Sequence, residues 1–512
     1  MTRKTITIKY TELCYYLFFS ILFFAKGIGL YDGQMSFKVC LVLAAVPVAV
    51  KLLMTDYDRR QLLVSLALLL LGVIVYYCSG EKSALVFLVM MIGFKGISFD
   101  RIMKLGLIVW SAAFGLMVLK SILGAGNEVV MAHHKFGLDI LREGMGYSHP
   151  NVLHVSYAVL VVLILYVITD EKKRIRAYIL TLIGNGVVFL YSASYTGFML
   201  VIFLMAFHIY FTYRKDMSVP EKILTQAVFP VCVLFALFAP LLVDPDTPLF
   251  SLLNKLLNRR FYASRLYLLE NPVTLLGQKI YASHTYALDS SYVTLLIYGG
   301  LLLFVLVCAG YLYSIRQALK ERNGKALSIL LSFSIAGVIE PFLFNFSFKN
   351  LSLLVVAGYL FSVCKGGKQV KLFSGYDKAV TITLPVLQPQ NGWKESKKVL
   401  CAALAAAVIA AMYAGMVKMP QAIYVEEKYC DIEDKDPYRG KVEEGENAVF
   451  YGVTDETQVL YRFDQETILF ERVRDTIRLG FCVYLAVYGG ITYFLPKKRG
   501  KEVCRQERKN RS

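Results

Sequence analysis

Residues 244–292, DPDTPLFSLLNKLLNRRFYASRLYLLENPVTLLGQKIYASHTYALDSSY, form a basic and aromatic stretch between two strongly apolar runs. The stretch concentrates reactive side chains as little else in the chain does: Arg259, Arg260, Arg265, His284 and Asp289. Apolar runs of about 20 residues span the hydrocarbon core of a membrane as helices. We therefore expect residues 244–292 to be a loop that two membrane helices hold outside the lipid.

The composition predicts a polytopic membrane protein. Hydrophobic residues make up 56% of the 512 residues and charged residues only 18%, and the apolar residues come in repeated long runs. Lipid offers the backbone no hydrogen-bond partners, so these runs are expected to be helices. The first run is too long for a cleavable signal peptide and lacks a small-residue cleavage site. The net charge of +18 sits in short loops between runs, which favours membrane lipids as partners and argues against nucleic acid.

The apolar runs predict fourteen spans with both termini on one side of the membrane. Loops that alternate with the opposite set carry about twice as many Lys and Arg residues, and cytoplasmic loops are the basic ones. This asymmetry predicts that both termini are cytoplasmic and that residues 244–292 lie outside. The spans are expected at 12–30, 35–53, 61–78, 83–97, 105–123, 151–169, 176–192, 195–213, 223–243, 290–313, 326–346, 351–364, 398–417 and 477–495.

The chain is predicted to divide into three parts, and its fold class is all-α with one small α+β module. Residues 1–364 form a twelve-helix membrane domain with the external substrate loop 244–290. Residues 365–397 are a cytoplasmic linker with Pro385, Pro389 and Gly392. Residues 398–512 form a two-helix appendage with an external module, 418–476, and a basic cytoplasmic tail. Within that module, AVFYGV (448–453) and TQVLYRF (457–463) have the composition of strands.

The long loop is predicted to contain one amphipathic helix, residues 248–271. Thr247 is a suitable N-cap, Pro248 fits the first helical position and Pro272 limits the other end. Its leucines would face lipid or protein, and its arginines the headgroup layer.

Several side chains are candidates for binding an anionic substrate. Arg259, Arg260 and Arg265 could hold a diphosphate through bidentate hydrogen bonds, or they could simply contact lipid headgroups. Arg142, His149 and Asn151 precede or open a span whose helix N-terminus favours anions, although a capping turn with a satisfied histidine explains them as well.

Polar residues at the ends of other spans are candidates for sugar binding and proton transfer. Ser192, Ser194 and Thr196 could bond sugar hydroxyls, although helix capping is the commoner role. Asp289, beside Tyr292, could act as general base or as an N-cap, and His284 is the rival base. Glu340 is expected in the outer third of a span, where a carboxylate is costly; it is either functional or paired with Lys82 or Lys349. The ten cysteines show no CxxC metal spacing.

Five segments, in this order, resemble the Wzy-type O-antigen and capsular polysaccharide polymerases and the O-antigen ligases, which share a superfamily. The segments are REGMGYSHPN (142–151), YSASYTG (191–197), LNRRFYAS (257–264), the GQ turn at Gly277, and LDSSYVTLLIYGG (288–300). The resemblance covers about residues 1–364. It implies a GT-C-like bundle and an inverting glycosyltransferase that uses an undecaprenyl-diphosphate-linked oligosaccharide as donor, without metal or other cofactor.

The resemblance also implies roles for individual residues. Arg260 matches the loop arginine that holds the diphosphate, and Arg142 the basic residue before the HPN motif. Ligases usually carry His-Asn where this chain has Asp289 and Ser290, which favours a polymerase with Asp289 as base. Tyr195 stands where relatives often carry arginine. The expected activity is polymerisation of repeat units into capsular polysaccharide or exopolysaccharide, with flippase and chain-length regulator proteins as expected partners. A ligase, or a non-enzymatic exporter or flippase of lipid-linked sugars, is the alternative.

Overall fold

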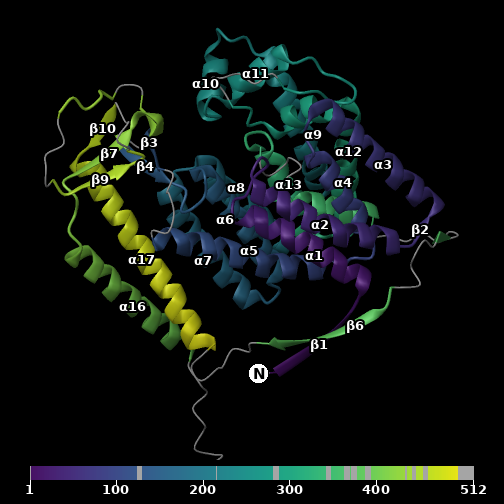
Figure 1. The fold of residues 1–512 in the computed structure, drawn as a ribbon, viewed down its shortest axis with the longest axis horizontal. Coiled ribbons are helices and arrows are strands. Elements are labelled where there is room, and N and C mark those ends of the chain that lie inside the picture. Colours follow the sequence, from purple (N-terminus) through teal and green to yellow (C-terminus); the bar gives the residue numbers. More distant parts are fainter. Residues whose placement is uncertain are drawn as a thin grey trace, which may run out of the picture. The chain divides into compact units, whose positions relative to one another are not determined.

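The computed structural model describes residues 2–123, 130–135, 137–214, 216–280, 287–341, 348–361, 369–370, 377–386, 394–432, 435–440, 446–453 and 459–493. This part of the chain is mostly helical and contains sixteen α-helices and small sheets (Figure 1). The chain divides into a large unit, residues 9–128 and 144–379, and a small unit, residues 1–8, 129–143 and 380–512.

The helices of the large unit follow the apolar runs of the sequence. They are α1 (Tyr10–Gly27), α2 (Met35–Met54), α3 (Arg59–Ser79), α4 (Ser83–Gly93), α5 (Phe99–Ile122), α6 (Pro150–Val167), α7 (Glu171–Ser192), α8 (Tyr195–Tyr213), α9 (Val219–Leu242), α10 (Pro248–Leu256), α11 (Arg260–Glu270), α12 (Ser291–Lys320), α13 (Gly324–Ala336) and α15 (Leu351–Phe361). Two short strands, β2 (Tyr57–Asp58) and β5 (Gln369–Val370), pair antiparallel.

Nine of the described helices are long and apolar enough to cross a membrane: α2, α3, α5, α6, α7, α8, α9, α12 and, in the small unit, α16 (Glu395–Met416). The chain is therefore a multi-pass membrane protein. Each of the fourteen expected spans overlaps a helix, but α4, α13 and α15 have only 11, 13 and 11 residues. A spanning helix needs about 20 residues, and these three helices are shorter than that over the described residues. They pack inside the bundle, and Leu351–Ala357 of α15 are all buried.

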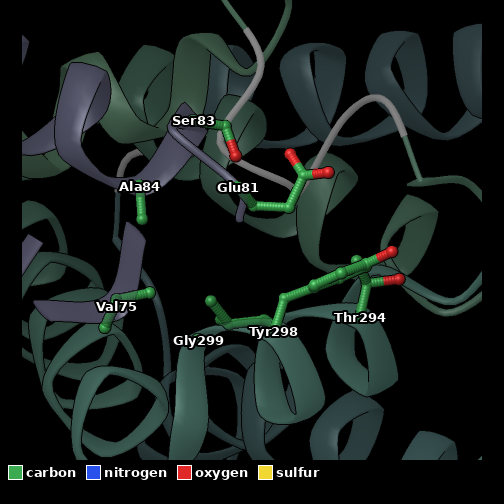
Figure 2. Close-up of a pocket in the computed structure, with 8 residues that line it drawn as sticks. Val75, Glu81, Ser83, Ala84, Thr294, Tyr298 and Gly299 are labelled. Atoms are coloured by element: carbon green, nitrogen blue, oxygen red, sulfur yellow. The ribbon is translucent and has the colours of Figure 1, made fainter. Parts of the chain in front are cut away.

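Helix α12 is broken about a third of the way along, where a continuous span was expected. Gly300 has φ 74° and ψ 166°, outside the helical region. The loop segment 274–278 fits into the break: the amides of Leu301 and Leu302 donate to the carbonyls of Thr274 and Leu275 at 2.9 and 3.1 Å, and the amide of Gln278 donates to the carbonyl of Ile297 at 3.1 Å. The break therefore leaves these backbone groups bonded. A cavity lies beside it (Figure 2).

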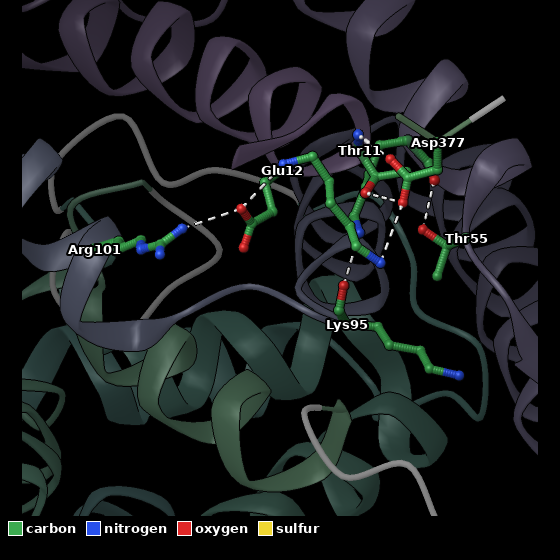
Figure 3. A network of polar contacts seen from close by, with 8 residues as sticks. Thr11, Glu12, Thr55, Lys95, Arg101 and Asp377 are labelled. Carbon is green, nitrogen blue, oxygen red and sulfur yellow. Dashed lines mark hydrogen bonds and ion pairs between the residues drawn. The ribbon is translucent and has the colours of Figure 1, made fainter. Parts of the chain in front are cut away.

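A polar network joins the start of α1, the end of α2 and the segment that follows α4 (Figure 3). The Lys51 ammonium group donates to the carbonyl of Lys95 at 2.7 Å, and the Lys95 ammonium group to the carbonyl of Asp56 at 2.5 Å. Asp377, far along the chain, accepts bonds from the amide and the hydroxyl of Thr11, both at 3.1 Å. Lys51 and Lys95 are almost fully buried, and these hydrogen bonds give their ammonium groups partners. A buried charged group without such partners would destabilise the bundle.

The small unit pairs α16 with α17 (Gln465–Tyr493), and its two three-stranded sheets lie at one end of α17 (Figure 1). One sheet has the order β10-β7-β9 and another β4-β3-β8, while β1 (Thr2–Lys9) pairs with β6 (Ala379–Val386). The other strands are β3 (Val130–Lys135), β4 (Leu138–Glu143), β7 (Ala422–Glu426), β8 (Cys430–Asp431), β9 (Ala448–Tyr451) and β10 (Leu460–Phe463). Both strands expected from composition are present as β9 and β10.

The hairpin β3–β4 belongs to this small unit, although the sequence placed it in the membrane domain. β3 runs parallel to β8, with Ala132 opposite Cys430. Arg474 of α17 is almost fully buried; it bonds the carbonyl of Leu141 at 2.6 Å, the carboxylate of Glu471 at 2.8 Å, and the carboxylate of Glu143. A buried arginine with carboxylates on two elements thus fixes the hairpin to the helix.

Candidate functional site

Arg260 lies at the centre of a buried charge cluster in the large unit. It is the first residue of α11, and its side chain is 9% exposed. Its Nε donates to Oδ2 of Asp289 at 2.8 Å, and its Nη2 lies 3.6 Å from Oε1 of Glu340. One guanidinium group is therefore shared by two carboxylates that come from different elements.

The local backbone explains how Arg260 reaches this place. A single helix over 248–271 was expected, but the structure has α10 and α11 separated by a break, with φ 51° at Asn258 and 65° at Arg259. Thr247 caps α10, as expected, by accepting from the amide of Phe250 at 3.3 Å. The break turns the chain so that Arg260 is buried while Arg259 remains exposed. The sequence shows two adjacent arginines, and the fold gives them opposite environments.

Asp289 and Glu340 are brought together by hydrogen bonds between the start of α12 and the residues that follow α13. The amide of Ser291 donates to the carbonyl of Gly337 at 2.9 Å, and its hydroxyl donates to the carbonyl of Glu340 at 2.5 Å. Glu340 was expected inside a span, but it follows the end of α13 at Ala336. The N-cap of α12 is Ser290, so the expectation that Asp289 caps this helix is wrong; its carboxylate bonds Arg260 instead.

Glu340 also receives a hydrogen bond from α8. The hydroxyl of Thr196 donates to its Oε1, the oxygen nearest to Arg260. The Glu340 side chain is 2% exposed and that of Asp289 is 28% exposed. Glu340 is thus the enclosed member of the cluster and Asp289 the member that faces solvent. Lys82, one of the two lysines expected as a partner of Glu340, lies 3.2 Å from Asp32.

A hydrogen-bonded chain extends from Thr196 into the bundle. The hydroxyls of Ser194 and Thr196 are 3.4 Å apart, and the amide of Ser194 donates to the hydroxyl of Ser192 at 3.3 Å. The Ser192 hydroxyl is 2.9 Å from Nδ1 of His154, whose Nε2 is 2.8 Å from Oδ1 of Asn185. An amide oxygen only accepts, so Nε2 carries the proton and Nδ1 accepts from Ser192.

His154 was missed by the sequence reasoning because it lies within the apolar run of α6. It is fully buried, and Gly197 of α8 packs directly against its ring: a Cβ at Gly197 would lie 2.6 Å from the His154 Cγ. The signal that could have identified it is the presence of a further polar residue, Asn185, in the next apolar helix. His154 holds the turn between α7 and α8, which presents Thr196 to Glu340.

Other candidates have structural roles in this structure. Ser194 caps α8 by accepting from the amide of Gly197 at 3.3 Å, and His149 caps α6 by accepting from the amide of Asn151 at 3.0 Å. Arg265 donates to the carbonyls of Pro240 and Leu241 at 2.8 and 3.1 Å, at the end of α9. The expected capping roles of Ser194 and His149 are therefore confirmed.

Tyr292 is also part of the packing. It is fully buried, and its hydroxyl donates to the carbonyl of Ser334 at 2.8 Å. His284 lies outside the described residues.

Arg142 belongs to β4 of the small unit, where it is buried and its Nη1 lies 3.4 Å from Nε2 of His133. Burial, and after it the charge of Arg142, lower the pKa of His133 to about 4. His133 is therefore neutral at pH 7, although Asp431 lies 3.1 Å from its Nε2.

Among the described residues, no cluster of three or more His, Cys, Asp or Glu side chains could hold a metal ion. What the site does offer is a buried cation beside a half-exposed carboxylate. Within the described residues, Oδ1 of Asp289 takes no hydrogen bond, while Oδ2 is held by Arg260. This arrangement leaves one carboxylate oxygen available to a hydroxyl group next to a fixed positive charge.

The fold and this cluster define a multi-pass helical membrane protein in which one arginine is shared by two carboxylates. No protein-family model, curated protein or solved structure matches the chain.

Proposed function

We propose that this chain polymerises undecaprenyl-diphosphate-linked oligosaccharide repeat units into capsular polysaccharide or exopolysaccharide at the outer face of the cytoplasmic membrane. The observation that carries the proposal is the Arg260–Asp289 pair, with its 2.8 Å bond, at the edge of an otherwise apolar bundle. Ionisable groups in such a place are expensive and mark functional sites. The resemblance of LNRRFYAS and LDSSYVTLLIYGG to the polymerase and ligase segments supports the same two residues.

The proposed reaction uses Asp289 as the base. Its free Oδ1 takes the proton of an acceptor hydroxyl, and that oxygen attacks the anomeric carbon of the donor glycan. The new glycosidic bond forms as the bond between that carbon and the diphosphate oxygen breaks, which inverts the configuration. The undecaprenyl diphosphate leaves with the electron pair of the broken bond.

Arg260 has two tasks in this reaction. It fixes the carboxylate of Asp289 and it stabilises the negative charge that develops on the departing diphosphate. The site is partly dry, so this stabilisation is larger than it would be in water. Glu340, bonded to Thr196, holds the guanidinium group from its other side.

The direct test is purified protein in liposomes incubated with one defined undecaprenyl-diphosphate-linked repeat unit. Products of two and more units are expected, and Asp289→Asn should lower turnover more than it lowers donor binding. Single units that only cross the membrane would support an exporter or flippase instead. Transfer to a different acceptor without chain growth would support the ligase alternative.

A further inference from the structure

A cavity of about 220 Å³ lies beside the break in α12. It is lined by the end of α3, the turn before α4, the start of α4 and the first half of α12. Its polar lining consists of Glu81, Ser83, Thr294 and Tyr298, and Val75 and Leu295 contribute apolar surface. The Glu81 carboxylate and the Tyr298 ring lie on opposite sides of the space (Figure 2). The cavity therefore combines hydrogen-bonding groups with an aromatic surface.

At the break, the backbone of the loop segment around Gly277 lies directly against the backbone of α12. A Cβ at Gly277 would lie 2.0 Å from the carbonyl oxygen of Tyr298, and one at Gly300 would lie 2.2 Å from the amide nitrogen of Gly277. Both glycines also have positive φ, 86° and 74°. Broken helices in membrane proteins occur where the backbone is buried in protein or lines a cavity, and transporters place their ligands at such breaks. The break and the cavity are independent observations that point to the same location.

A polar stripe connects this cavity with the proposed reaction centre. Ser290, Thr294 and Tyr298 follow one another at intervals of four residues, so they share one face of α12. Ser290 directly follows Asp289, and Thr294 lies about 6 Å further along the helix axis. The hydroxyl of Ser290 is fully buried and has no hydrogen-bond partner among the described residues. A polar ligand in the cavity would therefore have a polar path toward Asp289.

The side chains that line the cavity also indicate the chemistry of the ligand. A carboxylate repels phosphate, and an acyl chain would leave Glu81 and the hydroxyls without hydrogen bonds. Burial, and after it the charge of Asp32, raise the pKa of Glu81, which favours a group that both donates and accepts hydrogen bonds. The volume is below the roughly 300–1,000 Å³ that drug-sized ligands occupy, so it suits a single ring with its substituents.

We propose that this cavity binds one saccharide ring of the acceptor glycan, with Glu81 and Thr294 bonding ring hydroxyls and Tyr298 packing against the ring. This inference rests on the proposed function, because it assigns the acceptor side of that reaction. The hydroxyl of Thr294 donates to the carbonyl of Ser290 at 2.8 Å, so it would accept from the sugar. The acceptor hydroxyl next along the glycan would then reach toward Asp289.

The kinetic test uses liposomes with the full-length protein, a defined undecaprenyl-diphosphate-linked repeat unit as donor, and a short-chain lipid analogue of the repeat that lacks diphosphate. This analogue can accept but cannot donate. Glu81→Gln and Thr294→Val should each raise KM for the analogue about tenfold or more, the loss expected for one hydrogen bond to a ligand, while KM for the donor and kcat change little. Glu270→Gln is the matched control, because Glu270 is exposed at the end of α11. An unchanged KM for the analogue would overturn the proposal.

A second measurement separates this inference from the proposed function. In Ser83→Cys, maleimide labelling is measured with and without the analogue, and labelling of the unsubstituted protein is subtracted. Protection by the analogue supports the cavity as a saccharide site even if the wild-type protein transfers no glycan. Transfer without protection overturns the cavity and leaves the proposed function standing. Protection by phosphatidylethanolamine vesicles but not by the analogue would assign the cavity to a lipid amine and refute the saccharide.

Discussion

Replacement of Arg260 by alanine is the most informative perturbation of the site. It removes the 2.8 Å bond to Asp289 and the 3.6 Å contact with Glu340. The side chain of Glu340 is 2% exposed, so a buried carboxylate loses its cation. Removing one partner of a buried ion pair costs about 3–5 kcal/mol of stability. Many domains have only about 5–15 kcal/mol in total, so the variant must be shown to fold before its activity is interpreted.

Arg260→Ala should also lower activity, for a reason that is separate from its loss of stability. Removing one preorganised group that stabilises developing negative charge costs about 10²- to 10³-fold in rate. We therefore expect cells with Arg260→Ala to lose polymer and to accumulate single lipid-linked repeats on the outer face of the membrane. The assay is polymer length by electrophoresis, with the accessibility of single repeats to an external glycosidase as the readout for sidedness. Lys255→Ala in α10, an exposed cation of the same loop, is the control.

A compensated variant separates chemistry from stability. Arg260→Gln combined with Glu340→Gln leaves hydrogen-bonding groups of similar shape and no enclosed carboxylate without its cation. Its thermal unfolding midpoint should recover toward that of the wild type, while polymer formation should remain lost. Polymer formation by the compensated variant would refute the role of the Arg260 charge in the reaction. Accumulation of single repeats on the inner face would refute the enzyme and favour a flippase.

Three further predictions concern stability. Gly197→Ala should lower the thermal unfolding midpoint, because its Cβ would lie 2.6 Å from the His154 ring and overpacking costs about 1–3 kcal/mol, whereas Gly186→Ala, with open space around it, should not. Arg474→Met should expose residues 130–143 to limited proteolysis, since two buried carboxylates lose their cation at about 3–5 kcal/mol; unchanged cleavage would contradict this. The folded-state pKa of His133 lies below its ordinary value, so the small unit should lose stability as pH falls from about 6.5 to about 4, and His133→Asn should flatten that slope in thermal unfolding.

The sequence predicted the helices well because the length of an apolar run is a local property. It did not predict the break at Gly300, since a glycine inside an apolar run is also tolerated in a continuous helix. The break depends on residues 274–278, whose carbonyls and amides complete it. The pairing of β3 with β8 could not be predicted either. It joins segments about 300 residues apart, and no local sequence pattern specifies the partner strand.

The candidate site was predictable residue by residue but not as a cluster. Arg260, Asp289 and Glu340 each stand out as charges at the ends of apolar runs. Their meeting depends on the turn at Arg259 and on the bonds of Ser291, which are tertiary features. His154 by itself was not a candidate, because one histidine in an apolar helix is usually a packed one. Only its bonds to Ser192 and Asn185 connect it with the site.

The cluster itself argues for a functional reason rather than a stabilising one. Buried ion pairs are poor stabilisers, because apolar side chains of the same shape often serve as well or better. This bundle encloses the Arg260 guanidinium group together with the Glu340 carboxylate and the Thr196 hydroxyl that bonds it, and a second carboxylate, Asp289, bonds the same arginine from the more exposed side. Under the proposed function the second carboxylate has a purpose: it keeps Arg260 compensated and oriented when no diphosphate is bound. A bound diphosphate would then compete with Glu340 for the guanidinium group, so Glu340→Gln alone should tighten donor binding while it lowers stability.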